Sequence, residues 1–271
     1  MDNRPIGVFD SGLGGLTAVR ELEKRMPSES IIYFGDTGRV PYGSRSREII
    51  TRYARQDVAF LRSFDLKAVV IACGTVSTTA IDVLKAEQDI PVFGVVEPSA
   101  RRAAERTRNG KIGLIATRAS ISTGAYESAI HALRPAAEIF PIACPLFVPL
   151  VENGRTQPGD VVIETVVRDY LTPLKEAGVD VLVLGCTHYP LLREVIGAFM
   201  GPEVELVDSG AEVAHAVGSW LETHDALAET GHSGLRRWCV SDSQQGFRDL
   251  ASRFLGRAVT EPVDLVDIER Y

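Results

Sequence analysis

The sequence lacks several features that would assign a protein to a class at once. No apolar run approaches the eighteen or so residues of a membrane span. The opening stretch, MDNRPIGVFDSG, has neither the basic region nor the cleavage site of a secretion signal. The net charge of -7 comes without any block of Lys or Arg. We therefore expect a cytoplasmic protein with no membrane segment and no nucleic-acid partner.

Cysteine and lysine are both sparse. The four cysteines form no CxxC pair, which argues against a zinc site and a thioredoxin-like motif, so no metal is expected. Cys144, which precedes a proline, and Cys239, in the predicted strand RRWCV, are interpreted as structural. None of the lysines is placed like a Schiff-base lysine of a pyridoxal enzyme, since each begins a predicted strand or lies on a polar helical face. We expect no cofactor.

An internal echo suggests two related halves. Residues 68–75 read AVVIACGT and align with residues 181–188, VLVLGCTH, so that Cys73 falls on Cys186. Ahead of each copy comes a second matching pair, IGVFDSG at 6–12 and IGLIATR at 112–118. Each half therefore ends a strand in a cysteine.

The alternation of apolar strands and helical patterns predicts an α/β fold. We expect two similar three-layer domains with largely parallel sheets, related by a pseudo-twofold, with the active site in the cleft between them. The predicted strand at 235–240 and helix at 244–255 find no partner in the second half. They are assigned to a discontinuous first domain of residues 1–97 and 209–271, which leaves 98–208 for the second.

Local patterns place several helix starts. A glycine-rich turn at 10–15 leads into a helix with one apolar face, formed by Leu16, Val19, Leu22 and Met26. The turn lacks the order of a dinucleotide or Walker loop, so it is interpreted as a tight turn with room for a small ligand. Further helices are expected from about 77 to 86 and, capped by Ser209, through 221.

Two cysteines that face each other across a cleft suit one reaction in particular. One thiolate removes a proton from a carbon, and the opposite thiol delivers a proton to its other face, which inverts the centre. Because an ordinary thiol has a pKa of about 8.5, each needs a helper near neutral pH. His188, two residues after Cys186, and Asp10, at the end of a strand beside that of Cys73, are the candidates. The alternatives are a satisfied loop histidine and a helix-capping aspartate.

Two further acids are left open by the sequence. Asp36 follows a predicted strand, where it either belongs to a site or stabilises an Asx-turn. Glu152 is the one carboxylate that follows the apolar stretch from 145, and it faces either solvent or a site.

Four motifs in the chain resemble the bacterial glutamate racemases: DSGLGGL, GDTGRVPYG, IACGTVS and LGCTHYP. The resemblance implies cofactor-independent and metal-independent interconversion of L- and D-glutamate, which supplies D-glutamate for peptidoglycan, by an enzyme of two α/β domains. It also implies that Cys73 is the base for D-glutamate with Asp10 as its helper, and Cys186 the base for L-glutamate with His188. The implied substrate-binding residues are Asp10, Ser11, Tyr42, Gly43, Gly74, Thr75, Thr187 and His188, with Asp36 and Glu152 as further acids around the site.

One position departs from that family. Its first cysteine motif commonly reads Cys-Asn-Thr, whereas this chain has Cys73-Gly74-Thr75. We expect Gly74→Asn to change the KM for glutamate by less than about tenfold. His188 favours glutamate over aspartate as the substrate, because related aspartate racemases tend to have a glutamate residue at this position of the sequence. Racemisation of aspartate or another acidic amino acid, and a catalytically impaired glutamate-binding homologue, are the alternatives. Glutamate is the expected ligand, and a homodimer is considered.

Overall fold

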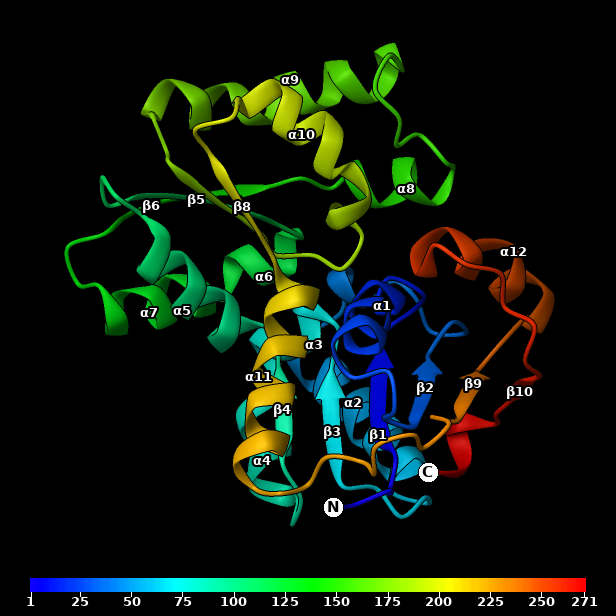
Figure 1. The fold of residues 1–271 in the computed structure, drawn as a ribbon. Helices are drawn as coiled ribbons and strands as arrows, with labels where there is room; N and C mark the ends of the chain where they lie inside the picture. The colour runs from blue at the N-terminus through cyan, green and yellow to red at the C-terminus, as the bar shows by residue number, and fades with distance from the viewer.

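The computed structural model describes all of residues 1–271 as two parallel sheets with helices packed around them (Figure 1). The first sheet has the strand order β10-β9-β2-β1-β3-β4 and the second β6-β5-β7-β8. Every pairing in both sheets is parallel. The predicted class, α/β with two parallel-sheet domains, is therefore confirmed.

The strands lie close to the predicted ranges, apart from β10, which was not predicted. Their bounds are β1 Ile6–Asp10, β2 Ile31–Gly35, β3 Ala68–Ile71, β4 Val92–Gly94, β5 Lys111–Ala116, β6 Glu138–Ala143, β7 Val181–Leu184, β8 Glu205–Asp208, β9 Arg236–Val240 and β10 Val263–Leu265. Most are short and buried along their length, as expected of parallel strands covered by helices on both faces.

Twelve α-helices and three short 3-10 helices connect the strands. The α-helices are α1 Leu16–Arg25, α2 Arg47–Leu61, α3 Gly74–Thr79, α4 Ile81–Glu87, α5 Val96–Arg106, α6 Arg118–Ser122, α7 Ala125–Leu133, α8 Phe147–Glu152, α9 Val161–Ala177, α10 Arg193–Met200, α11 Ser209–Thr223 and α12 Gln244–Leu255. The 3-10 helices are η1 Tyr42–Ser44, η2 Tyr189–Leu192 and η3 Ile268–Arg270. None of these helices is long and apolar enough to cross a membrane.

The internal echo corresponds to a repeated strand order. The order β2-β1-β3-β4 in the first sheet matches β6-β5-β7-β8 in the second, so β3 and β7 hold equivalent places. Phe9 of β1 pairs with Ile71 of β3, and Ile115 of β5 pairs with Leu184 of β7. Cys73 and Cys186 therefore follow corresponding strands, each beside the strand that begins its own half.

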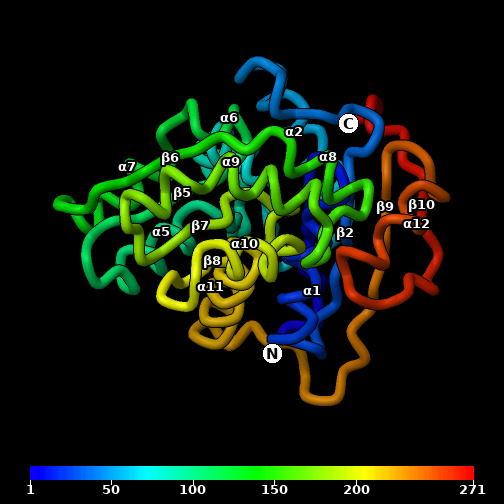
Figure 2. Tube along the Cα trace, turned by 90° about the horizontal axis from the view of Figure 1, so that it is seen from above, coloured from blue at the N-terminus to red at the C-terminus, as the bar shows by residue number.

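The C-terminal strands extend the first sheet. β9 pairs with β2, and β10 pairs with β9. Seen from above, α12, β9 and β10 gather beside β2, on the side of the molecule away from α7 (Figure 2). The predicted domain bounds agree with this division of the strands between the sheets, although the bounds themselves remain a prediction.

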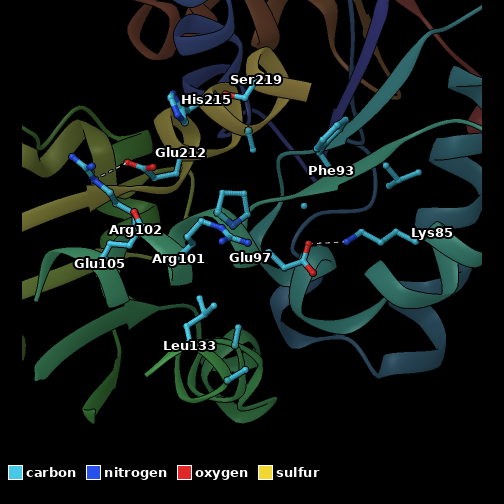
Figure 3. A pocket seen from close by; sticks show the side chains of 16 residues that line it. Lys85, Phe93, Glu97, Arg101, Arg102, Glu105, Leu133, Glu212, His215 and Ser219 are labelled. Atoms are coloured by element: carbon cyan, nitrogen blue, oxygen red, sulfur yellow. Dashed lines mark hydrogen bonds and ion pairs between the residues drawn. The ribbon is translucent and has the colours of Figure 1, made fainter. Parts of the chain in front are cut away.

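The chain passes between the sheets twice, along α5 and along α11. These two helices pack against each other, and a surface hollow of about 740 Å³ lies beside them, lined mainly by α5, α11, α7 and β4 (Figure 3). Its charged side chains partly pair with one another: Lys85 lies 2.8 Å from Glu97, and Arg102 lies 3.6 Å from Glu212.

Two predicted helix starts were wrong. The helix after Cys73 begins at Gly74 rather than near residue 77, because β3 already ends at Ile71, and it breaks at Ala80 before α4. The residue that caps α11 is Asp208, whose carboxylate accepts hydrogen bonds from the N–H groups of Gly210 and Ala211. Ser209 instead donates its hydroxyl to the carbonyl of Leu184 at 2.7 Å, which ties the start of α11 to β7.

Candidate active site

A cavity of about 630 Å³ lies where the carboxyl ends of both sheets meet. It is lined from the first sheet by the residues that follow β1 and β3 and by the turn around Tyr42, and from the second sheet by those that follow β5 and β7. Nearly all predicted site residues line it: Asp10, Ser11, Tyr42, Gly43, Cys73, Gly74, Thr75, Glu152, Cys186, Thr187 and His188. Both cysteines thus share one cavity, as the echo predicted.

Cys73 has two polar neighbours from the end of β1. The Ser11 hydroxyl lies 3.3 Å from its sulfur, and the Asp10 carboxylate is close enough for its charge to act on the thiol. Burial, together with the negative charge of Asp10, raises the pKa of Cys73 to about 12. Burial likewise raises the pKa of Asp10, against the opposing effects of the His188 charge and of hydrogen bonds from the N–H groups of Gly15 and Gly12. Cys73 is therefore a neutral thiol at pH 7, next to a carboxylate that can take its proton.

Cys186 has a histidine as its neighbour. Nδ1 of His188 lies 3.9 Å from the Cys186 sulfur, and Nε2 lies 3.1 Å from a carboxylate oxygen of Glu152. Burial alone would lower the pKa of His188, but the hydrogen bonds to Cys186 and Glu152 and the charge of Asp10 outweigh it and raise that pKa to about 10. His188 is then an imidazolium at neutral pH, which places a positive charge beside the sulfur of Cys186.

Glu152 and Asp36 turn out to have different positions. Glu152, the last residue of α8, lines the cavity and contacts His188. Asp36 does not line the cavity. It lies buried behind the wall, where its carboxylate accepts hydrogen bonds from Tyr42 and Ser241 and pairs with Arg39 at 2.6 Å.

The turn around Tyr42 is held by a second buried acid that the sequence analysis missed. The Tyr42 hydroxyl donates to Asp57 at 3.0 Å, and Arg39 contacts the other oxygen of the same carboxylate at 2.9 Å. Burial and the charge of Asp36 raise the pKa of Asp57 well above its usual range. A signal was present, since Asp57 interrupts the apolar face of α2 between Ala54 and Leu61.

Hydroxyl groups line the cavity from both sheets. Thr75 Oγ1 lies 3.3 Å from Thr117 Oγ1, which belongs to the turn after β5 and was not predicted. The backbone carbonyl of Thr187 accepts a hydrogen bond from Thr17 of α1 at 2.9 Å. Each of these contacts joins the first sheet's side of the cavity to the second sheet's side, and hydroxyl groups of this kind can bind an anionic ligand.

The other two cysteines differ from each other. Cys239 is buried in β9, outside the cavity, in line with a structural role. Cys144 is also buried but lines the cavity, so the purely structural interpretation was incomplete. Burial raises the pKa of its thiol, and the negative charge of a Cys186 thiolate would raise it further.

The cavity brings together one thiol from each sheet, Cys73 near Asp10 and Cys186 near His188, along with hydroxyl donors. None of the five lysines lines it, and nowhere do three or more His, Cys, Asp or Glu side chains gather as a metal site would require. Such an arrangement can remove a proton from one face of a carbon and return one to the other.

Comparisons with known proteins agree with this chemistry. The family model for Asp/Glu/Hydantoin racemases matches residues 17–217. A glutamate racemase from Geobacter metallireducens is 49% identical over 93% of both chains. The structure of a glutamate racemase from Bacillus anthracis superimposes with a TM-score of 0.92, at 37% identity over 98% of both chains. The structure of a glutamate racemase from Francisella tularensis in complex with D-glutamate superimposes with a TM-score of 0.91, at 36% identity over 100% of both chains. The chain therefore belongs to the Asp/Glu/Hydantoin racemase family, and within it to the glutamate racemases.

Proposed function

We propose that this protein is an amino-acid racemase that interconverts L- and D-glutamate with two cysteines as its acid and base. The observation that carries the proposal is the shared cavity, in which Cys73 and Cys186 extend from corresponding strands of the two sheets. The relatives named above support glutamate as the substrate, since one of them was solved with D-glutamate bound.

In the L-to-D direction, the thiolate of Cys186 takes the α-proton of L-glutamate. The electron pair left on the α-carbon then takes the proton of the Cys73 thiol on the opposite face, which gives D-glutamate. Cys186 ends the cycle as a thiol and Cys73 as a thiolate, so the D-to-L direction starts from that state. Two features of the site without substrate support a start in the L-to-D direction. Cys73 holds its proton, and His188 carries a positive charge beside Cys186.

The helpers act on one thiol each. Asp10 accepts the proton of Cys73 when that thiol must become a base, and His188 stabilises the thiolate of Cys186. Glu152 holds the imidazole in place through Nε2. The carboxylates of glutamate are bound by the hydroxyls of Ser11, Thr75 and Thr187, by N–H groups at Gly74 and Thr75, and by the Tyr42–Gly43 turn.

The wider role is proposed from the family. D-Glutamate is a peptidoglycan component, so the protein would supply it in the cytoplasm. Racemisation of aspartate is the alternative, but the identity of the relatives favours glutamate.

Exchange of the α-proton in heavy water tests the proposal most directly. Purified protein without added cofactor should convert either enantiomer of glutamate and place deuterium at the α-carbon of the product. Cys73→Ala and Cys186→Ala should each stop conversion, whereas Cys239→Ala, which removes a buried thiol outside the cavity, should not. Conversion by either active-site variant at the wild-type rate would refute the two-thiol mechanism, and faster turnover of aspartate would refute the substrate.

A further inference from the structure

Gly74 lies directly against the opposite catalytic loop. It is the first residue of α3, next to Cys73, and it faces Gly185, next to Cys186. A Cβ atom added at Gly74 would lie 2.7 Å from the backbone oxygen of Gly185. Side-chain carbons do not approach within 3.0 Å, and this obstacle is backbone rather than a flexible side-chain end. Any side chain at residue 74 must therefore displace one loop from the other.

The backbone conformation of Gly74 does not require a glycine. The φ angle of Gly74 is not in the left-handed region that favours glycine. Gly74 also lies in a helix, where glycine is less favourable than alanine. A local reason for the glycine is thus missing, and the contact with Gly185 supplies one. The neighbouring contact between Thr75 and Thr117, at 3.3 Å, joins the Cys73 loop to a different part of the second sheet, the turn after β5.

A second glycine touches the same loop from the other side. A Cβ added at Gly14 would collide with the side chain of Thr187 and would lie 2.5 Å from Nδ1 of His188. Two glycines in loops of the first sheet, Gly74 and Gly14, therefore contact the loop that bears Cys186. Of the two, Gly74 is adjacent in sequence to the partner thiol.

We infer that Gly74 is a positioning residue that sets the separation of the two thiols by letting the catalytic loops meet backbone to backbone. The inference rests on the proposed function and deepens it. A methyl group at residue 74 requires a displacement of at least 0.3 Å, the difference between 2.7 and 3.0 Å. Proton transfer at a carbon held between two groups is sensitive to displacements of this size. Relatives with Cys-Asn-Thr hold a Cβ at this position, and in this chain Gly74→Asn requires the same displacement of the loops as Gly74→Ala.

Gly74→Ala tests the inference, with Gly197→Ala as its matched control. Gly197 also lies within a helix, and a Cβ added there meets only Leu206, at an ordinary 3.7 Å. We expect Gly74→Ala to lower kcat/KM for both enantiomers about tenfold or more. The unfolding temperature measures what the displacement of the loops costs, against the gain in helix propensity from alanine. Gly197→Ala should retain wild-type kinetics.

A second readout separates positioning from a merely structural role. In heavy water, the near thiol carries the protium that it has just removed, and it can return deuterium to the substrate only after that proton has exchanged with solvent. An α-carbanion that waits longer for the far thiol allows more of this exchange and more return to the substrate. The ratio of deuterium in the recovered substrate to deuterium in the product should therefore rise several-fold in Gly74→Ala. An unchanged rate, or a slower rate with an unchanged ratio, would overturn the inference. Failure of the wild type to racemise glutamate would instead refute the proposed function, so the two failures are distinguishable.

Discussion

The hydroxyl of Tyr42 lies 3.0 Å from the carboxylate of Asp57, a buried acid in the middle of α2. Asp57 does not line the cavity, yet through Tyr42 and Arg39 it holds the turn that does. It is a positioning residue, and its effect on the reaction should appear in substrate binding before it appears in chemistry.

Asp57→Ala should raise the KM for glutamate about tenfold and change kcat less. The substitution removes the carboxylate that the buried Tyr42 hydroxyl and Arg39 both contact. The loss of these contacts should lower the free energy of unfolding by about 1–3 kcal/mol. Steady-state kinetics in both directions and urea unfolding measure the two effects. Asp249→Ala, at an exposed position of α12, is the control. A large fall in kcat at unchanged KM would contradict the positioning role.

The two helpers should act one-sidedly. Asp10→Asn should slow proton removal from D-glutamate more than from L-glutamate, and His188→Asn the reverse, because each contacts a different thiol. Since a catalyst cannot change the equilibrium, kcat/KM must fall by the same factor in both directions. The difference therefore has to be sought in the isotope effects of α-deuterated substrate. Equal changes in the two directions would refute the assignment of one helper to each thiol.

The charge on His188 predicts how stability varies with pH. Its pKa is about 10 in the folded protein against an ordinary 6.5, so the folded state binds a proton that the unfolded state has lost. The stabilisation is complete below about pH 6.5 and disappears as pH rises through about 10. Relative to His188→Gln, the wild type should lose on the order of 1 kcal/mol per pH unit between these limits. Urea unfolding at several pH values measures this, and a difference that is independent of pH would show that His188 is neutral.

Glu152→Gln should lower the pKa of His188, because it replaces the carboxylate on Nε2 by a neutral amide. Titration followed by NMR with labelled histidine measures the change, and the chain has only five histidines to assign. Glu194→Gln, an exposed position of α10, serves as the control. If the titration of His188 is unaffected, Glu152 orients substrate rather than the imidazole.

The sequence predicted the parts of the site that depend on strand ends. Because the side chains after parallel strands gather at one edge, the echo around Cys73 and Cys186 was enough to bring both thiols into one cavity. For Asp57 the sequence offered only an interruption of the apolar face of α2, because the contact of Asp57 with Tyr42 depends on how α2 packs against the turn around Tyr42. The contact of Gly74 with Gly185 was hidden for the same reason, since it joins residues far apart in the chain.

The order in which the strands are synthesised differs from their order in the first sheet. All four strands of the second sheet lie between residues 111 and 208, so all of them are synthesised before β9. Until then, β2 is an unpaired edge, which is open to association with other chains. Ser241, which donates to Asp36 behind the Tyr42 turn, arrives with the same late segment. The wall of the cavity can therefore take its final form only after β9 has docked on β2.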